Sequence, residues 1–463
     1  MLNANDQTDR AALRSPGHGL DPLLRMQELR RLGRLLVSYE AADFWEMDTQ
    51  RLPAPLARLR RRARTFAEQH LRPRVQDLDA AHTEPGHLAA PARELLVQAG
   101  RDGWMTGMLP APWGTANWLE MRYPTHLRFA IQVEELARVC GGQMLLLSAH
   151  QLGLAPIALS GDLGAMQRFF RPMTRDFLAG QPHLFAYAIT EPGAGSDAED
   201  GHGAAHNTPR VLARPVRGGY RLNGRKCFIS GGDVARKIAV FAALEGEGFE
   251  SWTCFVVDAG NPGLAALRTE LKMGMRASSA AELAFNEAFV PSCDIVGGLR
   301  QGWALNRATL NASRYPVAAM AVGFARHACE LAMAHAREQR LGGRPLLAYQ
   351  EYQLQVAQMI AETRAMRALL WQQAQGSFQA RQGESSLSKF HITDRAQAVC
   401  SMGLAILAEH GMAKHQGMEQ VLRDLRLTRI FEGTNQINRL ALIEDMPLAG
   451  SQQGCGGDLT ISV

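Results

Sequence analysis

The chain has 463 residues, 46% of them hydrophobic, and a formal net charge of +5 at pH 7. This length predicts two or three domains, and the mild charge favours an anionic ligand without arguing for nucleic acid. The seven cysteines are dispersed and form no CxxC pair, which argues against a disulfide framework and indicates a cytoplasmic protein. We expect neither a secretory signal nor a membrane span, because the start is polar and no run of about 18 apolar residues occurs.

The first part of the chain has a helical pattern. Residues 1–50 are predicted to form an N-terminal arm that is polar at first. Residues 51–183 are predicted to form an α-helical domain, since apolar residues recur there at helix spacing. The residues of the first such face are Leu56, Leu59, Ala63 and Phe66.

The middle and last parts differ in texture. Residues 184–298 carry short runs rich in β-branched and aromatic residues, separated by turn-forming residues, and predict a domain of antiparallel strands. Residues 299–447 return to helical spacing and predict a four-helix bundle. Residues 448–463 are predicted to be a flexible tail. The predicted fold class is therefore α+β: an all-α domain, an antiparallel β-domain and a helical bundle.

The stretch AYAITEPGAGSD (186–197) joins a predicted strand to a Pro192-Gly193 break and a run of small residues. Small residues let backbone N–H groups approach an anion or a flat heterocycle, and Thr190 and Ser196 add hydroxyls. The alternative is an ordinary glycine-rich hairpin loop. A P-loop is excluded because no Gly-Lys-Ser/Thr follows, and a dinucleotide fingerprint is excluded because no βαβ unit surrounds it.

The stretch RIFEGTNQINRL (429–440) places Glu432 between an apolar Ile430-Phe431 pair and a Gly-Thr turn. Glu432 is either a general base beside a substrate or a carboxylate near the start of the last helix, with Thr434 as its cap. Sequence spacing alone leaves both interpretations open.

The basic run ARLRRRARTF (57–66) is interpreted as the solvated face of an amphipathic helix, in preference to a patch for an anionic partner. Nucleic acid is therefore not favoured as a partner. The histidines show no metal-ligand spacing, and we assign no metal.

AYAITEPGAGSD resembles the signature of the acyl-CoA dehydrogenase family, and further matches follow in the family's order. They are RLNGRKCFISGG (221–232), KMGMRASSAAELAFNEAFVP (272–291), SRYPVAAMAVGFARHACELAMAHA (313–336) and VLRDLRLTRIFEGTNQINRL (421–440). The resemblance covers residues 55–447. It implies a flavoprotein of fatty acid metabolism that holds FAD between the β-domain and the bundle. Such an enzyme oxidises an acyl-CoA to a trans-2-enoyl-CoA, with the β-hydrogen leaving as hydride to flavin N5.

By this resemblance, Glu432 is the base that takes the α-proton, and Gly433 leaves room for the thioester. The positions of the family's flavin contacts are occupied by Ile189, Thr190, Ser196, Phe228, Ser230, Thr434 and Gln436. The positions of its substrate contacts are occupied by Tyr187, Ser196, Arg314 and Gly433. The simpler alternatives are that Phe228 is a core residue, Ser230 a turn residue and Arg314 a cation on a helix surface.

The resemblance also implies the partners. They are an acyl-CoA or acyl-carrier-protein thioester, an electron-transferring flavoprotein, and further copies of the chain in a homodimer or homotetramer. Two elements that reach the neighbouring subunit's FAD differ from the family pattern. Gln339 stands where an arginine is expected, and Ala405 and Ala408-Glu409 replace a glutamine and a glycine pair. These differences keep a flavin-poor, non-catalytic partner subunit open as an alternative. A flavin oxidase or monooxygenase on the same fold is a second alternative, because oxygen access cannot be read from the sequence.

Overall fold

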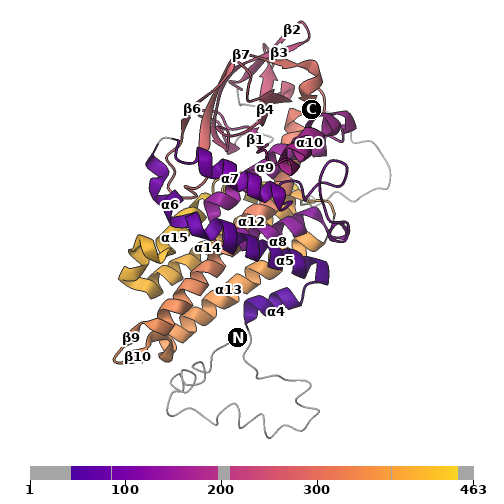
Figure 1. Cartoon of the computed structure of the whole chain (residues 1–463). Helices are drawn as coiled ribbons and strands as arrows, with labels where there is room; N and C mark the ends of the chain where they lie inside the picture. Colours follow the sequence, from indigo (N-terminus) through magenta and orange to yellow (C-terminus); the bar gives the residue numbers. More distant parts are fainter. Residues whose placement is uncertain (1–42, 85, 197–208, 377, 447–463) are drawn as a thin grey trace.

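A computed structural model describes residues 43–84, 86–196, 209–376 and 378–446, and shows three blocks in chain order (Figure 1). The first block is helical, as predicted. Its α-helices are α4 (Phe44–Gln50), α5 (Ala54–Phe66), α6 (Val75–Ala80), α7 (Ala89–Arg101), α8 (Thr125–Ala137), α9 (Gly141–Leu159) and α10 (Leu163–Leu178). Most of the predicted arm and the predicted tail lie outside the described residues. The end of the arm forms α4, whose Asp48 accepts hydrogen bonds from Arg364 and Arg367.

The second block is a sheet at one end of the molecule (Figure 1). Its strands are β1 (Phe185–Ala188), β2 (Leu212–Val216), β3 (Gly219–Ser230), β4 (Lys237–Leu244), β5 (Thr253–Asp258), β6 (Leu264–Thr269), β7 (Ala280–Pro291) and β8 (Ile295–Val296). Among the described residues they form one sheet in the order β6-β7-β3-β2-β4-β5-β8, with β1 on β4. The predicted antiparallel pairing is confirmed for most neighbours, but β4 pairs in parallel with both β1 and β2.

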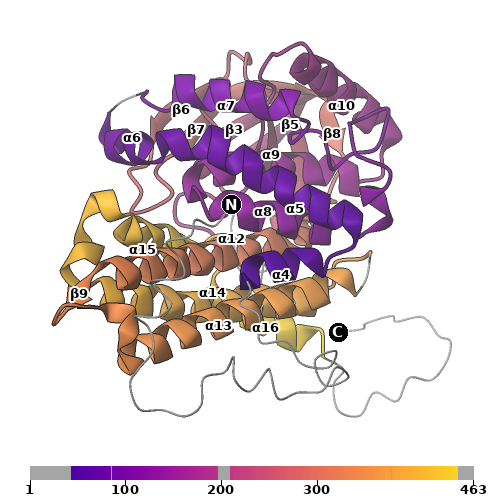
Figure 2. The same ribbon diagram turned by 60° about the horizontal axis from the view of Figure 1, so that its bottom comes forward.

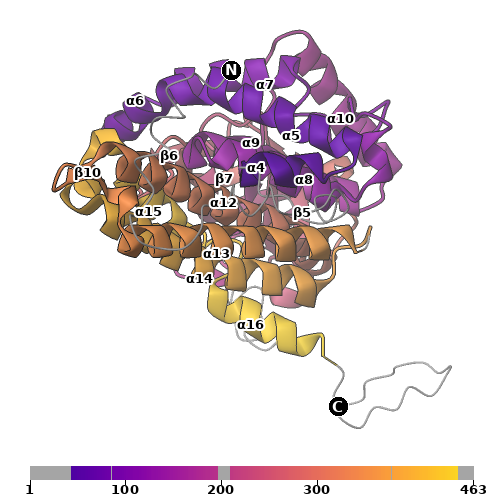
Figure 3. The same ribbon diagram turned by 90° about the horizontal axis from the view of Figure 1, so that it is seen from below.

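The third block is the predicted bundle. It contains α12 (Gly302–Glu338), a β9–β10 hairpin (Arg340–Leu341 and Arg344–Pro345), α13 (Gln350–Gln375), α14 (Gln382–Leu407), α15 (Met418–Leu427) and α16 (Asn435–Glu444). Helices α12, α13 and α14 contact one another, and α12 also packs against α8 (Figure 2). Figure 3 shows α16 on the outer side of the bundle, against α14. Helix α12 is apolar and long enough to cross a membrane, but 72% of its most apolar window is buried inside the fold, as expected for a core helix.

The basic run on α5 does not form a solvated face throughout, and that prediction is wrong for Arg60. Arg60 is fully buried, and its guanidinium donates to Glu135 at 2.7 Å and to Glu134 at 3.0 Å. Arg326 on α12 and Arg367 on α13 reach the same two carboxylates. The reason is that α8 buries two adjacent glutamates, and buried carboxylates require cationic partners. A buried ion cluster therefore joins the helical block to the bundle.

Candidate active site at the Glu432 turn

Glu432 lies in a tight turn between α15 and α16. Both Glu432 and Gly433 have positive φ, 56° and 77°. This conformation is unfavourable for a residue with a Cβ, so the surrounding structure has to hold it in place. Thr434 is the N-cap of α16, and its hydroxyl accepts a hydrogen bond from the N–H of Ile437 at 3.4 Å. The capping role considered for Thr434 is thus confirmed, whereas the half-buried Glu432 precedes the helix.

Two side chains hold the carbonyl of Gly433. Lys389 of α14 is fully buried and donates from Nζ to this carbonyl at 2.5 Å and to Oδ1 of Asn435 at 2.9 Å. Asn438 of α16 donates from Nδ2 to the same carbonyl at 3.0 Å. Neither residue was predicted from the sequence. The signal available for Lys389 was a lone lysine in a stretch of small and apolar residues, which is unusual for an exposed helix face.

Replacing Lys389 with methionine is expected to lower the free energy of unfolding by about 1–3 kcal/mol, because the acceptors it serves stay buried without its donors. The rate of substrate oxidation should fall as well, since the turn that carries Glu432 loses a support. Urea unfolding and steady-state kinetics measure the two effects. The matched control is Lys414→Met, because Lys414 is exposed and its replacement should change stability by less than about 0.5 kcal/mol. An unchanged unfolding midpoint for Lys389→Met would contradict the assignment.

The carboxylate of Glu432 accepts a hydrogen bond from the bundle. Ser313 of α12 donates from Oγ to Oε2 of Glu432 at 2.7 Å. The next residue, Arg314, is only 3% exposed, and its Nη1 lies 2.8 Å from Oγ of Ser386 on α14 and 3.1 Å from Oδ1 of Asn311. Arg314 is therefore not a surface cation, and the turn, α12 and α14 converge on Glu432.

The AYAITEPGAGSD stretch meets this turn through Ser196. Its Oγ accepts a hydrogen bond from the backbone N–H of Thr434 at 3.0 Å, which joins the loop after β1 to the start of α16. Glu191 and Ala194 bond to each other around Pro192-Gly193, with Gly193 at φ 86°, so the predicted break is a tight turn. The hairpin interpretation is thus correct locally, and this hairpin lies against the Glu432 turn.

The base of the same loop is held by a buried ion pair. Lys226 of β3 donates from Nζ to Glu191 at 2.8 Å and to the carbonyl of Ile189 at 2.7 Å. The carbonyl of Thr190 accepts from the N–H of Cys227 at 3.0 Å. Ile189 and Thr190 are therefore fixed against β3, with their side chains half-buried.

Phe228 does not belong to the β-domain core. It is 59% exposed, has φ 57°, and lies where the register between β3 and β7 shifts. A bulge re-aims side chains, and here it presents an aromatic ring outward. Ser230 follows at the end of β3, opposite Ala280 and half-buried. An exposed ring two residues before a half-buried hydroxyl on the same strand suits contact with a flat heterocycle.

Two further predicted site residues, Tyr187 and Gln436, lie on β1 and α16. Tyr187 is buried, packs on Phe241 and donates from its hydroxyl to Oδ1 of Asn306 at 2.6 Å, so it joins the sheet to α12. Its place in an acyl pocket stays a prediction. Gln436 is exposed on the first turn of α16.

The positions that depart from the family pattern are on the surface of this chain. Gln339 ends α12 and is exposed, and the side chain of Glu409 is 84% exposed. Ala408 has φ 47° and ψ −126°, a conformation that glycine adopts far more readily than alanine. The backbone at Ala408 thus has a shape typical of glycine although the residue is alanine.

Replacing Ala408 with glycine is therefore expected to raise the free energy of unfolding by about 0.5–1 kcal/mol, because the relieved strain exceeds the added chain entropy of the unfolded state. The midpoint of urea unfolding measures the gain. Ala413→Gly is the matched control: Ala413 has φ −80° and ψ 127°, so glycine there should destabilise the protein. A fall in stability for both variants would show that Ala408 is unstrained.

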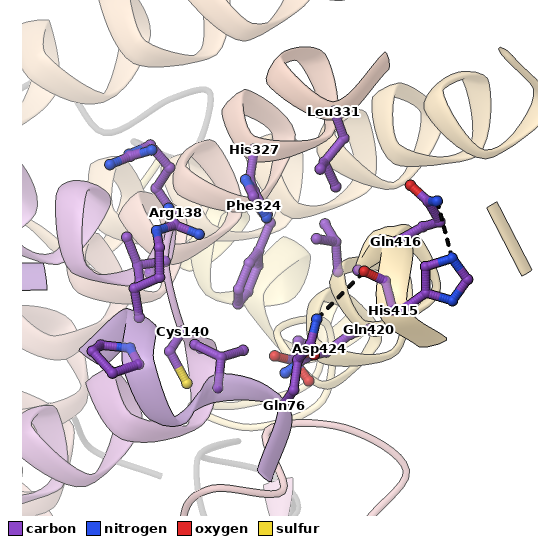
Figure 4. A pocket seen from close by; sticks show the side chains of 18 of the residues that line it. Gln76, Arg138, Cys140, Phe324, His327, Leu331, His415, Gln416, Gln420 and Asp424 are labelled. Atoms are coloured by element: carbon purple, nitrogen blue, oxygen red, sulfur yellow. Dashed lines mark hydrogen bonds between the residues drawn. The ribbon is translucent and has the colours of Figure 1, made fainter. Parts of the chain in front are cut away.

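A cavity of about 390 Å³ lies elsewhere, between the residues around α6 and helices α12 and α15 (Figure 4). Arg138, Cys140, His327 and Asp424 are among its lining residues, and none of the predicted site residues lines it. Burial raises the pKa of the Asp424 carboxyl to about 7. Within the described ranges, no group of three or more His, Cys, Asp and Glu side chains is placed to hold a metal ion. The Glu432 turn is therefore the candidate active site.

Comparison with known proteins decides the family. Models of the N-terminal, middle and C-terminal domains of acyl-CoA dehydrogenases match residues 56–176, 186–288 and 300–446. Cyclohex-1-ene-1-carbonyl-CoA dehydrogenase of Geobacter metallireducens is 35% identical over 384 residues, covering 81% of this chain and 94% of its own length. The chain belongs to the acyl-CoA dehydrogenase family. The predicted fold class is confirmed. As a member of this family, the protein is an oxidoreductase acting on CH–CH groups.

Two further similar proteins are named for other acyl-CoA compounds. Acryloyl-CoA reductase (NADH) of Anaerotignum propionicum is 30% identical and covers 84% of this chain and 93% of its own length. The structure of butyryl-CoA dehydrogenase from Megasphaera elsdenii superimposes with a TM-score of 0.75 at 26% identity, covering 87% of this chain and 99% of that protein. The general reaction of the family, hydrogen transfer at the Cα–Cβ bond of an acyl-CoA, therefore applies to this chain.

Proposed function

We propose that this protein is an FAD-dependent dehydrogenase that oxidises an acyl thioester to the trans-2-enoyl thioester, with Glu432 as the base for the α-proton. The observation that carries the proposal is the Glu432 turn. A half-buried carboxylate is held at positive φ by Lys389 and Asn438, and its oxygen is bonded to Ser313. A strained, well-supported position is typical of a functional side chain, because stability alone would favour glycine there.

The residues around the turn fit FAD. Phe228 offers an exposed ring for the flavin, and Ser230 ends the same strand, β3. Ile189 and Thr190 follow β1, and their carbonyls are bonded to β3. Cβ atoms added at Gly193 and Gly195 would meet nothing within 4 Å, which leaves room for close approach to the backbone. When bound, FAD supplies the acceptor for the β-hydrogen. Ser196, Thr434 and Gln436 are proposed to bind its phosphates and nucleotide half.

The chain's own residues then perform the acid–base part. Glu432, ionised and fixed by Ser313, takes the proton from Cα of the thioester. Gly433 has no side chain to obstruct the thioester, and the backbone N–H of Glu432 is proposed to donate to its carbonyl oxygen, where negative charge develops. Arg314 is proposed to support this arrangement from α12, where it bonds to Asn311 and Ser386.

The test is the visible spectrum of the purified protein, followed by anaerobic titration. A yellow protein, bleached by one member of a panel of acyl thioesters, is the expected result. The panel should include butyryl-CoA and cyclohex-1-ene-1-carbonyl-CoA, the compounds in the names of similar proteins, and the matching acyl-carrier-protein thioesters. A colourless protein that FAD does not reconstitute would contradict the proposal and favour a non-catalytic partner subunit. Substrate-dependent oxygen consumption would favour an oxidase or monooxygenase.

The reverse reaction is a second candidate, because a relative of 30% identity is named a reductase. Mixing the reduced enzyme with an enoyl-CoA separates the two directions by whether the yellow colour of the flavin returns.

For the dehydrogenase we propose an electron-transferring flavoprotein as acceptor, a cytoplasmic location and a homodimer or homotetramer. In such an assembly the exposed Gln339 and Glu409 would face the flavin of the neighbouring copy.

A further inference from the structure

Ser313 has one hydroxyl hydrogen and two acceptors within reach. Its Oγ is 2.7 Å from Oε2 of Glu432 and 3.2 Å from the carbonyl oxygen of Leu310, one turn earlier on α12. Hydrogen bonds from a hydroxyl to oxygen have lengths near 2.7–2.8 Å, and those to an ionised acceptor are stronger. The hydroxyl hydrogen of Ser313 therefore points to Oε2 of Glu432 while that carboxylate is ionised.

The same geometry also accommodates a protonated Glu432. Once the carboxyl carries a proton, it becomes a donor, and Oγ of Ser313 has free lone pairs to accept from it. The hydroxyl hydrogen of Ser313 can then rotate to the carbonyl of Leu310. A hydrogen bond thus joins Ser313 and Glu432 in both protonation states. The carboxyl therefore keeps its orientation through proton transfer.

We infer that Ser313 is a positioning residue for proton abstraction: it stabilises the ionised form of Glu432 and holds the carboxyl in one orientation in both protonation states. The inference rests on the proposed role of Glu432 as base. Ser313 lies on α12 directly before the buried Arg314, and its hydroxyl reaches Glu432 from that helix.

Charged side chains on the elements packed around the turn also make hydrogen bonds and ion pairs that do not involve Ser313. Lys389 bonds to Gly433 and Asn435, and Arg314 to Asn311 and Ser386. On the outer side, Asp394 of α14 pairs with both Arg429 and Arg439. Because none of these contacts involves the Ser313 hydroxyl, removing that hydroxyl leaves the local charges in place, and a change in the titration of Glu432 reports the lost hydrogen bond.

The experiment measures exchange of the substrate's Cα hydrogen with D₂O. The holoenzyme is reduced beforehand, so that no net oxidation occurs and only the acid–base step is observed. Glu432 takes the Cα proton and returns a deuteron, and mass spectrometry of the thioester reports the rate as a function of pH. Wild type is compared with Ser313→Ala, Ser313→Thr and Ser385→Ala. Ser385 is the matched control, because its buried hydroxyl also donates to the carbonyl three residues earlier, that of Gln382.

A hydrogen bond to the charged form of a carboxyl favours that form, so its loss raises the pKa. For Ser313→Ala we expect the midpoint of the rate–pH profile to rise by about one unit, with exchange about tenfold slower below the midpoint. Ser313→Thr, which keeps the hydroxyl, and Ser385→Ala should both keep the wild-type midpoint. Flavin content and the urea midpoint check that each variant is folded.

The outcomes separate this inference from the function on which it rests. If wild type exchanges deuterium but the midpoint of Ser313→Ala is unchanged, the role of Ser313 is overturned and Glu432 stays the base. An equal shift in Ser385→Ala also overturns it, since the effect is then a general one of α-helix serines. If wild type exchanges no deuterium, the base assignment fails, and the inference with it.

Discussion

Replacing Glu432 with glutamine is expected to slow anaerobic bleaching of the flavin by about 10²–10⁴-fold, the range over which a positioned acid–base group contributes to catalysis. The amide keeps the shape of the side chain and can still bond to Ser313, but it cannot accept the Cα proton. Flavin content and the urea midpoint should stay at wild-type values, because the turn is held by Lys389 and Asn438 through the backbone carbonyl of Gly433.

The control for this variant is Glu444→Gln. Glu444 ends α16, pairs with Arg307 at 2.9 Å and is partly exposed, so its substitution should leave the rate within about twofold of wild type. Bleaching at the wild-type rate in Glu432→Gln would show that the base lies elsewhere. Loss of flavin from that variant would instead indicate that Glu432 stabilises the cofactor site.

Replacing Glu134 with glutamine is expected to lower the free energy of unfolding by about 3–5 kcal/mol, because it removes one carboxylate from a buried ion cluster and leaves cations uncompensated. Glu134 is fully buried, and Arg60 and Arg367 both donate to it at 2.6–3.0 Å. Urea unfolding measures the effect. In the control, Glu46→Gln, the lost partners are the half-exposed Arg61 and Arg64, and the expected cost is below about 1 kcal/mol.

The same cluster makes stability depend on pH. Burial by itself raises the pKa of Glu134 and Glu135, but the arginines outweigh it and hold the pKa of each carboxyl below the ordinary value of 4.5. A carboxyl whose pKa is lowered by folding contributes stability above pH 4.5, and that contribution is lost as pH falls through the folded-state pKa. Wild type should therefore lose stability more steeply on acidification than Glu134→Gln. Parallel pH profiles for the two proteins would contradict this account.

Much of the architecture could be predicted from residue patterns. The switch from helical spacing to short β-rich runs and back determined three blocks in the right order, because periodicity records which face of a local element is buried. The Pro192-Gly193 turn and the Thr434 cap could be predicted for a similar reason, because they depend on local backbone chemistry. These features involve residues close together in the chain. Glu432 became the candidate base only through the resemblance of its motif to a family.

Tertiary structure decided everything that depends on which faces of distant elements meet. Arg60 and Arg61 are adjacent in one basic run, yet Arg60 is buried and Arg61 exposed, since Arg60 faces the glutamates of α8 and Arg61 faces Glu46. Ser313 and Lys389 reach the Glu432 turn from positions 119 and 44 residues distant. No local pattern encodes such contacts, because they arise from the packing of α12 and α14 around the turn. The sequence, through its resemblance to a family, thus proposed the candidate base, and the fold determined which side chains contact the turn that carries it.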